Sequence, residues 1–238
     1  MIDIDITLWF TLGTLGMALG SVGLAYGFVT LSSDRHREYA DVVVVTLIAT
    51  VAYGLMALGI GEITTASGAE LFVPRYVDWL LTTPLHVVFI ALIAGAGRRL
   101  IAKAAALQAA TIVLGFLGAV FATPLKELFF IAGSLAFVGV VYLLVIEAAK
   151  DAAERDDVTA GLYRKLRNFV IVLWLVYPII WLLAPTGYGF MDNETASLVI
   201  TYIDVVAKVG FGLIALNGLG TLETFDVADA TGYGSGDD

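Results

Sequence analysis

The sequence predicts an all-α integral membrane protein built as a bundle of seven transmembrane helices. Hydrophobic residues make up 59% of the 238 residues, charged residues make up only 15%, and the mean hydropathy is positive. An ordinary soluble domain does not have this composition. Apolar stretches of about twenty residues, the length that crosses roughly 30 Å of hydrocarbon, occur seven times along the chain. Each stretch is expected to be a helix, because a spanning segment must satisfy its own backbone hydrogen bonds.

The seven stretches are joined by short connections and are expected to form one transmembrane domain over residues 1–222. In chain order they cover residues 6–31, 40–61, 72–95, 102–122, 126–149, 162–184 and 195–222. The acidic start, MIDIDI, does not resemble a cleavable signal peptide, so the first helix is expected to remain in the mature protein. Residues 223–238 are acidic and are expected to form a disordered cytoplasmic tail. The chain has no cysteine, which excludes thiolate metal sites, and no metal site is predicted.

The basic residues predict the orientation of the bundle, because cytoplasmic loops retain Lys and Arg. Ten of the 13 lie in alternate connections or at the adjoining helix ends, which puts the N-terminus outside the cell and the C-terminus in the cytoplasm. The exceptions are Lys126 in an outer connection, Arg75 near the outer end of the third helix, and Lys208 in the middle of the seventh. The ten are Arg35, Arg37, Arg98, Arg99, Lys103, Lys150, Arg155, Arg164, Lys165 and Arg167.

Ionisable residues in the third and seventh helices are the strongest functional signal, because a charge at mid-membrane is costly and is usually functional. Arg75, Asp78 and Thr82 follow the spacing i, i+3, i+7 and share one face of the third helix. On the seventh helix, Asp204 lies one turn before Lys208. One interpretation is a buried salt bridge that fixes helix packing, although buried ion pairs stabilise proteins poorly. The other is a reactive lysine, whose amine can condense with an aldehyde.

Aromatic residues on the sixth helix suggest what the lysine holds. Trp174, Tyr177 and Trp181 lie on one face, and Pro178 interrupts the hydrogen-bond ladder among them. A stripe of this kind can be plain packing. Opposite Trp79 and a mid-membrane lysine, it also suits a flat polyene clamped between rings.

The segments RYVDWLLTTPL (75–85), WLVYPIIW (174–181) and DVVAKVGFGLIAL (204–216) together resemble the microbial (type 1) rhodopsins of the haloarchaeal kind, and the resemblance covers essentially the whole chain. It implies all-trans retinal as a Schiff base on Lys208, Asp78 as counterion and proton acceptor, Asp204 as second counterion with Tyr53 hydrogen-bonded to the cluster, and Arg75 as a cation beneath them. The implied cofactor-binding residues, with the nearby His86 added, are Lys208, Tyr76, Trp79, Thr82, Thr83, His86, Thr111, Gly115, Phe137, Trp174, Tyr177, Pro178 and Trp181.

Pumps and sensors of the family that this chain resembles differ at a few positions, and these positions narrow the predicted function. Asp78 disfavours an inward chloride pump, because a fixed anion would repel the transported one. Proton pumps of the family carry a carboxylic acid where this chain has Phe89, and they carry a proton-releasing acid where this chain has Ala196, with Glu194 two residues away. Phe89 cannot donate a proton, so the photocycle is expected to be slow. Slow decay of the light-activated state suits signalling, because the active state must outlive the response of the partner.

The sensory rhodopsin II group resembles this chain at Tyr177 and at Tyr202, on the face where a transducer helix would pack. Ala207 departs from that group, whose members carry a threonine there, and is instead typical of pumps. This combination of sensor-like and pump-like residues resembles the type called middle rhodopsin, which is part sensor and part pump.

His86 is unusual, because relatives of the resembling family are mostly aliphatic at this position. One interpretation is a histidine that is simply hydrogen-bonded inside the bundle. The alternative hypothesis is that His86 influences the colour, the isomer composition or the reprotonation of the Schiff base.

The predicted function is a multi-pass cell-membrane photoreceptor, not an enzyme, in which light drives a proton from the Schiff base to Asp78 and a slow photocycle signals phototaxis. The alternative is a weak, light-driven outward proton pump. Expected partners are membrane lipid, a two-helix transducer near the sixth and seventh helices, and further copies of the chain, but not nucleic acid.

Overall fold

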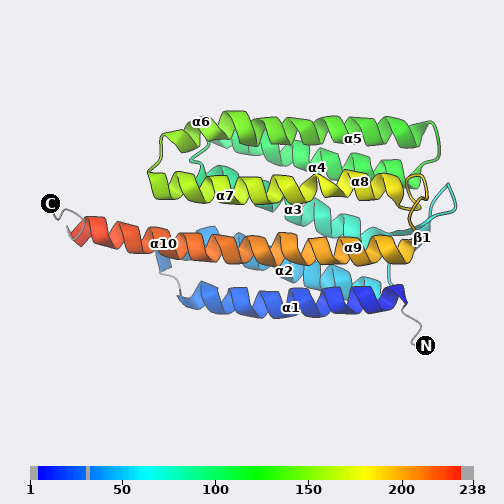
Figure 1. Cartoon of the computed structure of the whole chain (residues 1–238), viewed down its shortest axis with the longest axis horizontal. Helices are drawn as coiled ribbons and strands as arrows, with labels where there is room; N and C mark the ends of the chain where they lie inside the picture. The colour runs from blue at the N-terminus through cyan, green and yellow to red at the C-terminus, as the bar shows by residue number, and fades with distance from the viewer. Residues whose placement is uncertain (1–4, 31–32, 232–238) are drawn as a thin grey trace.

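The computed structural model describes residues 5–30 and 33–231 of the chain. The helices lie side by side in one elongated bundle, and the chain enters and leaves at opposite ends (Figure 1). Seven helical segments in the described part are long and apolar enough to cross a membrane, which confirms the fold class that the sequence predicts.

Four of the spans are single helices and three are composite. The single helices are α1 (Ile6–Thr30), α2 (Ser33–Ala57), α3 (Val73–Ile93) and α4 (Arg98–Val120). The fifth span joins α5 (Leu125–Tyr142), the π-helical turn η1 (Leu143–Glu147) and α6 (Ala148–Ala153). The sixth joins α7 (Asp157–Trp174) and α8 (Val176–Leu183). The seventh joins α9 (Asn193–Val205), the π-helical turn η2 (Val206–Gly210) and α10 (Phe211–Thr231).

The breaks within the spans have local causes that hydropathy alone does not reveal. The sixth span is interrupted at Leu175, between α7 and α8. Pro178 lacks the N–H that would bond to the carbonyl of Trp174, so the helical ladder loses a hydrogen bond at that point. The turn η2 contains Lys208. Single π-helical turns often occur at functional sites.

A short hairpin joins α2 to α3 and was not predicted from the sequence. Strands β1 (Glu62–Thr64) and β2 (Glu70–Phe72) pair antiparallel, with Ile63 opposite Leu71. Strands of three residues are too short to produce an alternating pattern that can be recognised. The N–H of Ala66 in the turn donates to the carbonyl of Val120, 3.1 Å away, which fastens the hairpin to α4. We call this the hairpin end of the bundle and the opposite end, where α10 finishes, the tail end.

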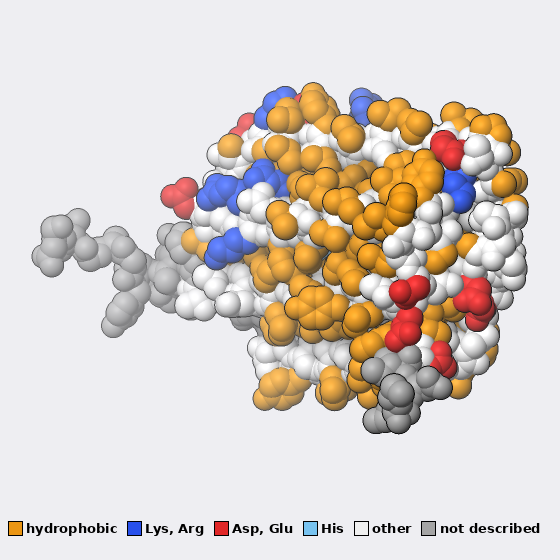
Figure 2. Space-filling view, turned by 45° about the vertical axis from the view of Figure 1, so that its right-hand side comes forward, with side chains coloured by type: hydrophobic (Ala, Val, Ile, Leu, Met, Phe, Trp, Pro, Cys, Tyr) orange, Lys and Arg blue, Asp and Glu red, His pale blue; other side chains and the backbone are white. Residues whose placement is uncertain are grey.

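Charged side chains are distributed unevenly between the two ends. The visible Lys and Arg side chains gather mainly toward the tail end, and hydrophobic side chains cover the middle of the bundle (Figure 2). The helix α10 runs on to Thr231, past the boundary of the predicted tail at residue 223, because a helix that leaves the apolar layer still satisfies its own backbone hydrogen bonds. Residues 232–238 of that predicted tail lie outside the described residues.

Close packing of α1 and α2 positions one side chain of the site. Tyr53 on α2 is fully buried, and a Cβ atom on Gly13 of α1 would overlap its ring. A glycine is therefore required where α1 passes the ring. The phenol of Tyr53 is held in place at the centre of the bundle.

Candidate functional site

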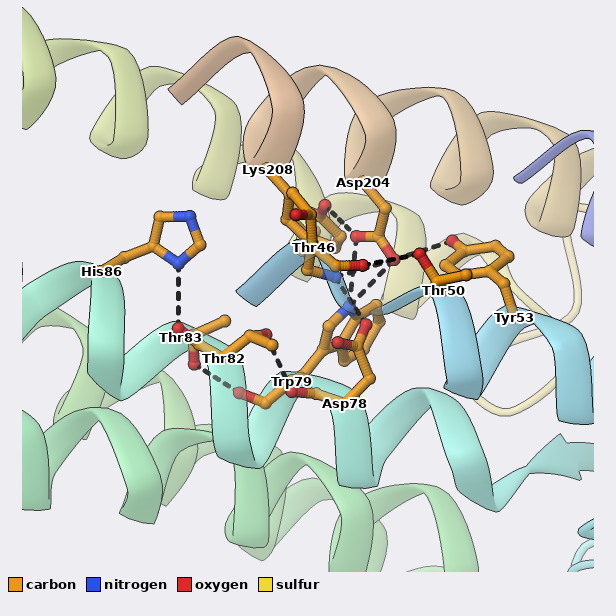
Figure 3. Close-up of polar contacts among 11 residues, drawn as sticks. Thr46, Thr50, Tyr53, Asp78, Trp79, Thr82, Thr83, His86, Asp204 and Lys208 are labelled. Carbon is orange, nitrogen blue, oxygen red and sulfur yellow. Dashed lines mark hydrogen bonds and ion pairs between the residues drawn. The ribbon is translucent and has the colours of Figure 1, made fainter. Parts of the chain in front are cut away.

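The centre of the site is the amine of Lys208, which lies between two carboxylates (Figure 3). Lys208 Nζ donates to Asp78 Oδ2 at 2.5 Å and lies 3.6 Å from Asp204 Oδ2. The three side chains are 3%, 0% and 1% exposed, respectively. One cation is thus shared by two anions in the apolar interior, where charges interact much more strongly than in water.

Asp78 is the less saturated of the two carboxylates. Its Oδ2 accepts from Lys208, while its Oδ1 has no hydrogen-bond partner among the described residues. The hydroxyl of Thr82, one turn along α3, donates to the backbone carbonyl of Asp78 at 2.8 Å. A carboxylate with an unused oxygen beside a protonated amine is well placed to accept a proton.

Asp204 has a complete set of donors. Its carboxylate accepts from the hydroxyl of Tyr53 at 2.7 Å, from the hydroxyl of Tyr177, and from Nε1 of Trp79 at 3.1 Å. Hydrogen bonds from several donors stabilise the ionised form of a carboxylate. The two carboxylates therefore differ in their hydrogen bonding: Asp204 accepts from three side chains besides its contact with Lys208, and Asp78 keeps one oxygen without a partner among the described residues.

Arg75 lies nearer the hairpin end than the two carboxylates. Its guanidinium donates to Ser197 Oγ at 3.3 Å and lies over the rings of Phe10 and Phe72, 5.5 Å from each centroid. Among the described residues Arg75 has no ion pair within 4 Å. Stacking on aromatic rings stabilises a buried guanidinium only in part, so Arg75 is a cation near the cluster without a direct carboxylate partner.

An elongated cavity runs beside Lys208. It has a volume of about 160 Å³ and extends to the hairpin end, where Glu70 and Asn193 line it. Two predicted site residues do not reach its wall, Asp78 and Thr82, and both are fully buried. The predicted residues that do line it are Arg75, Tyr76, Trp79, Thr83, His86, Thr111, Gly115, Phe137, Trp174, Tyr177, Pro178, Trp181, Asp204 and Lys208.

The wall suits a long, flat and apolar group attached to Lys208. The rings of Trp79 and Tyr177 meet edge to face with centroids 5.2 Å apart. A Cβ atom added to Gly115 would meet no atom within 4 Å, so a side chain there would project into free space along the wall. The retinal expected from the sequence fits this arrangement: an amine at the cavity, aromatic walls, and a glycine where bulk would obstruct.

Several wall residues were missed by sequence reasoning. Gln108 is buried, and its Nε2 donates to Thr83 Oγ1 at 2.9 Å. A lone glutamine in an apolar helix is a signal that could have identified it. Phe130, stacked on Trp181 at 4.7 Å, and Gly133 carry no such signal, because apolar and small residues are common throughout a membrane helix.

His86 has the hydrogen bond that the first sequence-based interpretation expects, and it lies at the cavity, where the second would require it to be. It is hydrogen-bonded inside the bundle, with Nδ1 2.9 Å from the carbonyl oxygen of Thr82, and it also lines the cavity. Its ring meets those of Trp174 and Phe211 edge to face, at 6.0 and 4.4 Å. The hydrogen bond therefore does not remove His86 from the site.

The residues that distinguish branches of the resembling family occupy different environments. Phe89 is buried on the tail side of His86, with its ring 5.5 Å from that of Phe211. Ala196 and Ala207 are buried and line the cavity. Tyr202 on α9 is 69% exposed.

Comparisons with known proteins agree with this architecture. A family model described as bacteriorhodopsin-like protein matches residues 5–222. The chain is 53% identical to sensory rhodopsin-2 from Haloarcula vallismortis over 214 residues, 89% of each chain, and 39% identical to sensory rhodopsin-2 from Natronomonas pharaonis, over 92% of this chain and 91% of that one. The crystal structure of the thermophilic rhodopsin from Rubrobacter xylanophilus superimposes with a TM-score of 0.88 at 33% identity, covering 92% of this chain and 97% of that chain.

Proposed function

The chain belongs to the bacteriorhodopsin-like family, and from this premise we propose that it is a retinal photoreceptor whose light reaction takes place between Lys208 and Asp78. Its sequence similarity to sensory rhodopsins supports a multi-pass protein of the cell membrane that serves phototaxis. The same similarity makes a proton pump the less favoured alternative. The observation that carries the residue assignment is the buried amine of Lys208, which lies at the cavity and 2.5 Å from Asp78.

Retinal, bound covalently at Lys208, supplies visible absorption and a change of shape on illumination. In the dark, the anions Asp78 and Asp204 stabilise the positive charge at Lys208 Nζ. On illumination a proton leaves Nζ for Asp78 Oδ2, so the pair loses its charges together. Asp204 stays ionised because Tyr53, Trp79 and Tyr177 donate to it. The aromatic wall holds the chromophore, and the apolar surroundings exclude water from Nζ.

Return of the proton to Nζ determines how long the signal lasts. Phe89 and Phe211 pack against each other on the tail side of the site and carry no titratable group. An apolar barrier delays protons from that side. The state in which Lys208 Nζ has lost its proton, called the deprotonated state below, therefore persists. The exposed ring of Tyr202 on α9 offers a contact for the helices of a transducer in the membrane. The tail end, where basic side chains gather, then faces the cytoplasm, and residues 1–222 form the retinal-binding domain.

An experiment in intact cells separates the sensor from the pump. Cells that express the chain are illuminated while the external pH is recorded. For a sensor we expect no sustained acidification, and we expect the deprotonated state to last many milliseconds after a flash. Sustained acidification that an uncoupler abolishes would instead establish the pump.

Replacing Asp78 tests the proton acceptor. In Asp78→Asn the positive charge at Lys208 loses its nearest anion, so the ground state is less stabilised and the visible band moves to longer wavelength. The flash-induced deprotonated state should also disappear, because an amide cannot accept the proton. Absorption spectra and flash photolysis measure the two effects.

Asp41→Asn is the matched control, because Asp41 is a carboxylate on α2 that does not line the cavity. Its band and its kinetics should equal those of the unmodified protein. An unshifted band in Asp78→Asn would place the counterion elsewhere.

A further inference from the structure

His86 contains a buried polar atom that the reaction described above does not use. Its side chain is 3% exposed, and its Nε2 has no hydrogen-bond partner among the described residues. A buried polar atom without a partner costs about 1–3 kcal/mol, and His86 is also on the wall of the cavity that holds Lys208. A leucine of similar size would avoid this cost, so the imidazole requires an explanation.

The hydrogen bond at the other nitrogen determines the tautomer of the neutral ring. Nδ1 lies 2.9 Å from the carbonyl oxygen of Thr82, which can only accept. The proton of neutral His86 is therefore on Nδ1, and Nε2 presents a lone pair. Edge-to-face contacts with Trp174 and Phe211 hold the ring in this orientation. His86 is thus a fixed base whose bare nitrogen is available to a proton.

The protonated ring keeps its contact with α3. An imidazolium donates at both nitrogens: Nδ1 lies beside the carbonyl oxygen of Thr82, and Nε2 has no partner among the described residues. Ala207, which lines the same cavity as His86, belongs to η2, the turn that contains Lys208. The ionisable side chains Lys208 and Asp204 line the same cavity as His86. When Lys208 is neutral, after its proton has moved to Asp78, the repulsion that opposes a charge on His86 is removed.

His86 lies between Asp78 and Phe89 along α3. On α3 the order from the site toward the tail end is Asp78, Thr82, His86 and Phe89, so His86 is the last titratable side chain before the apolar barrier of Phe89 and Phe211. A proton that crosses the barrier from the tail side meets His86 before it meets Lys208.

We propose that His86 is the proton relay that returns a proton to Lys208 from the tail side of the membrane. A proton from water that penetrates the barrier forms the Nε2–H bond of His86. That bond then breaks as the N–H bond of Lys208 Nζ forms, so one proton moves from solvent to Nζ and His86 returns to its neutral tautomer. The inference rests on the proposed function, since it concerns recovery after the transfer to Asp78. A relay without a fixed carboxylic donor behind it agrees with a slow cycle.

Flash photolysis of two variants separates proton relay from packing. In His86→Leu the deprotonated state should decay at least tenfold more slowly, in line with the roughly 10²–10⁴-fold contribution of a positioned acid or base. His86→Gln keeps a donor toward the carbonyl of Thr82 and a similar volume, but it cannot relay a proton. It should be as slow as His86→Leu. Added imidazole should accelerate both variants and leave the unmodified protein unchanged.

Three results of these measurements would contradict the proposed relay. Unchanged decay in His86→Leu, normal decay in His86→Gln, or slow variants that imidazole does not accelerate would each overturn the relay. A visible band in the unmodified protein shows that the proposed function stands even when the relay fails.

A second measurement is independent of turnover. The chain has two histidines, His86 and His36, so ¹⁵N NMR of the dark, retinal-bound protein can be assigned with His36→Gln. We expect a neutral ring protonated on Nδ1. A proton on Nε2 in the dark would overturn the proposal.

Discussion

Lys208→Ala is expected to abolish the visible absorption band completely when the protein is mixed with retinal. The aldehyde needs an amine at the cavity, and Lys208 supplies it from the turn η2. The other buried lysine is Lys126 at the hairpin end, where its Nζ donates to the carbonyl of Gly187 at 2.9 Å. It does not line the cavity, so it cannot replace Lys208. The measurement is the absorption spectrum after reconstitution, normalised to the amount of folded protein.

The matched control for this variant is Lys126→Met, which removes a second buried amine and keeps its apolar stem. This control should retain the full band. To distinguish lost attachment from misfolding, Lys208→Ala can be mixed with the Schiff base of retinal and n-butylamine, whose alkyl chain replaces the missing side chain. A visible band should then return. A normal band in Lys208→Ala with retinal alone would refute the assignment of the attachment site.

The seven helices could be predicted because hydropathy reports directly on lipid exposure. A span must be apolar over about twenty residues whatever it packs against. The structure therefore differs from the prediction mainly where hydropathy is silent: at the hairpin Glu62–Phe72, at the turn η2, and at the break near Leu175. Each of these depends on local hydrogen bonds, and apolar composition alone does not encode them.

In the site, too, residue spacing predicts which side chains share a face of one helix, but it does not predict contacts between helices. Asp78 and Arg75 could be placed on one face of α3 from their spacing, and Asp204 could be placed beside Lys208 in the same way. Spacing does not reveal that Tyr53, Trp79 and Tyr177, from three different helices, all donate to Asp204. That arrangement makes Asp204 and Asp78 unequal, and it depends on how the helices pack.

The difference between Asp78 and Asp204 explains how one buried cluster can support both a stable dark state and a proton transfer. A single carboxylate would have to be a good counterion and a good acceptor at once. In the proposed function Asp78, 2.5 Å from Lys208 Nζ, accepts the proton, and Asp204, 3.6 Å from Nζ, remains in the pocket as the second carboxylate. We expect Phe89, which lies toward the tail end, to control the lifetime of the signal.

Phe89→Asp is expected to shorten the lifetime of the deprotonated state at least tenfold. Phe89 is 2% exposed and lies eleven residues, about 16 Å at 1.5 Å per residue, from Asp78 along α3. A carboxylic acid there would be buried among apolar groups, which favour its protonated form. It would supply a donor on the tail side, and the positioned histidine between it and Lys208 would pass the proton on. Flash photolysis of the deprotonated state measures the decay rate.

Phe89→Asn is the matched control for this variant, because asparagine has the shape and polarity of aspartic acid but no proton to donate. If Phe89→Asn decays as fast as Phe89→Asp, the acceleration comes from loosening of the contact with Phe211, not from proton donation. If only Phe89→Asp is fast, its decay should also vary little with external pH near neutrality, because the proton comes from inside the protein. In that case the apolar ring at position 89 sets the duration of the signal, and adding His86→Leu to Phe89→Asp should remove most of the gain.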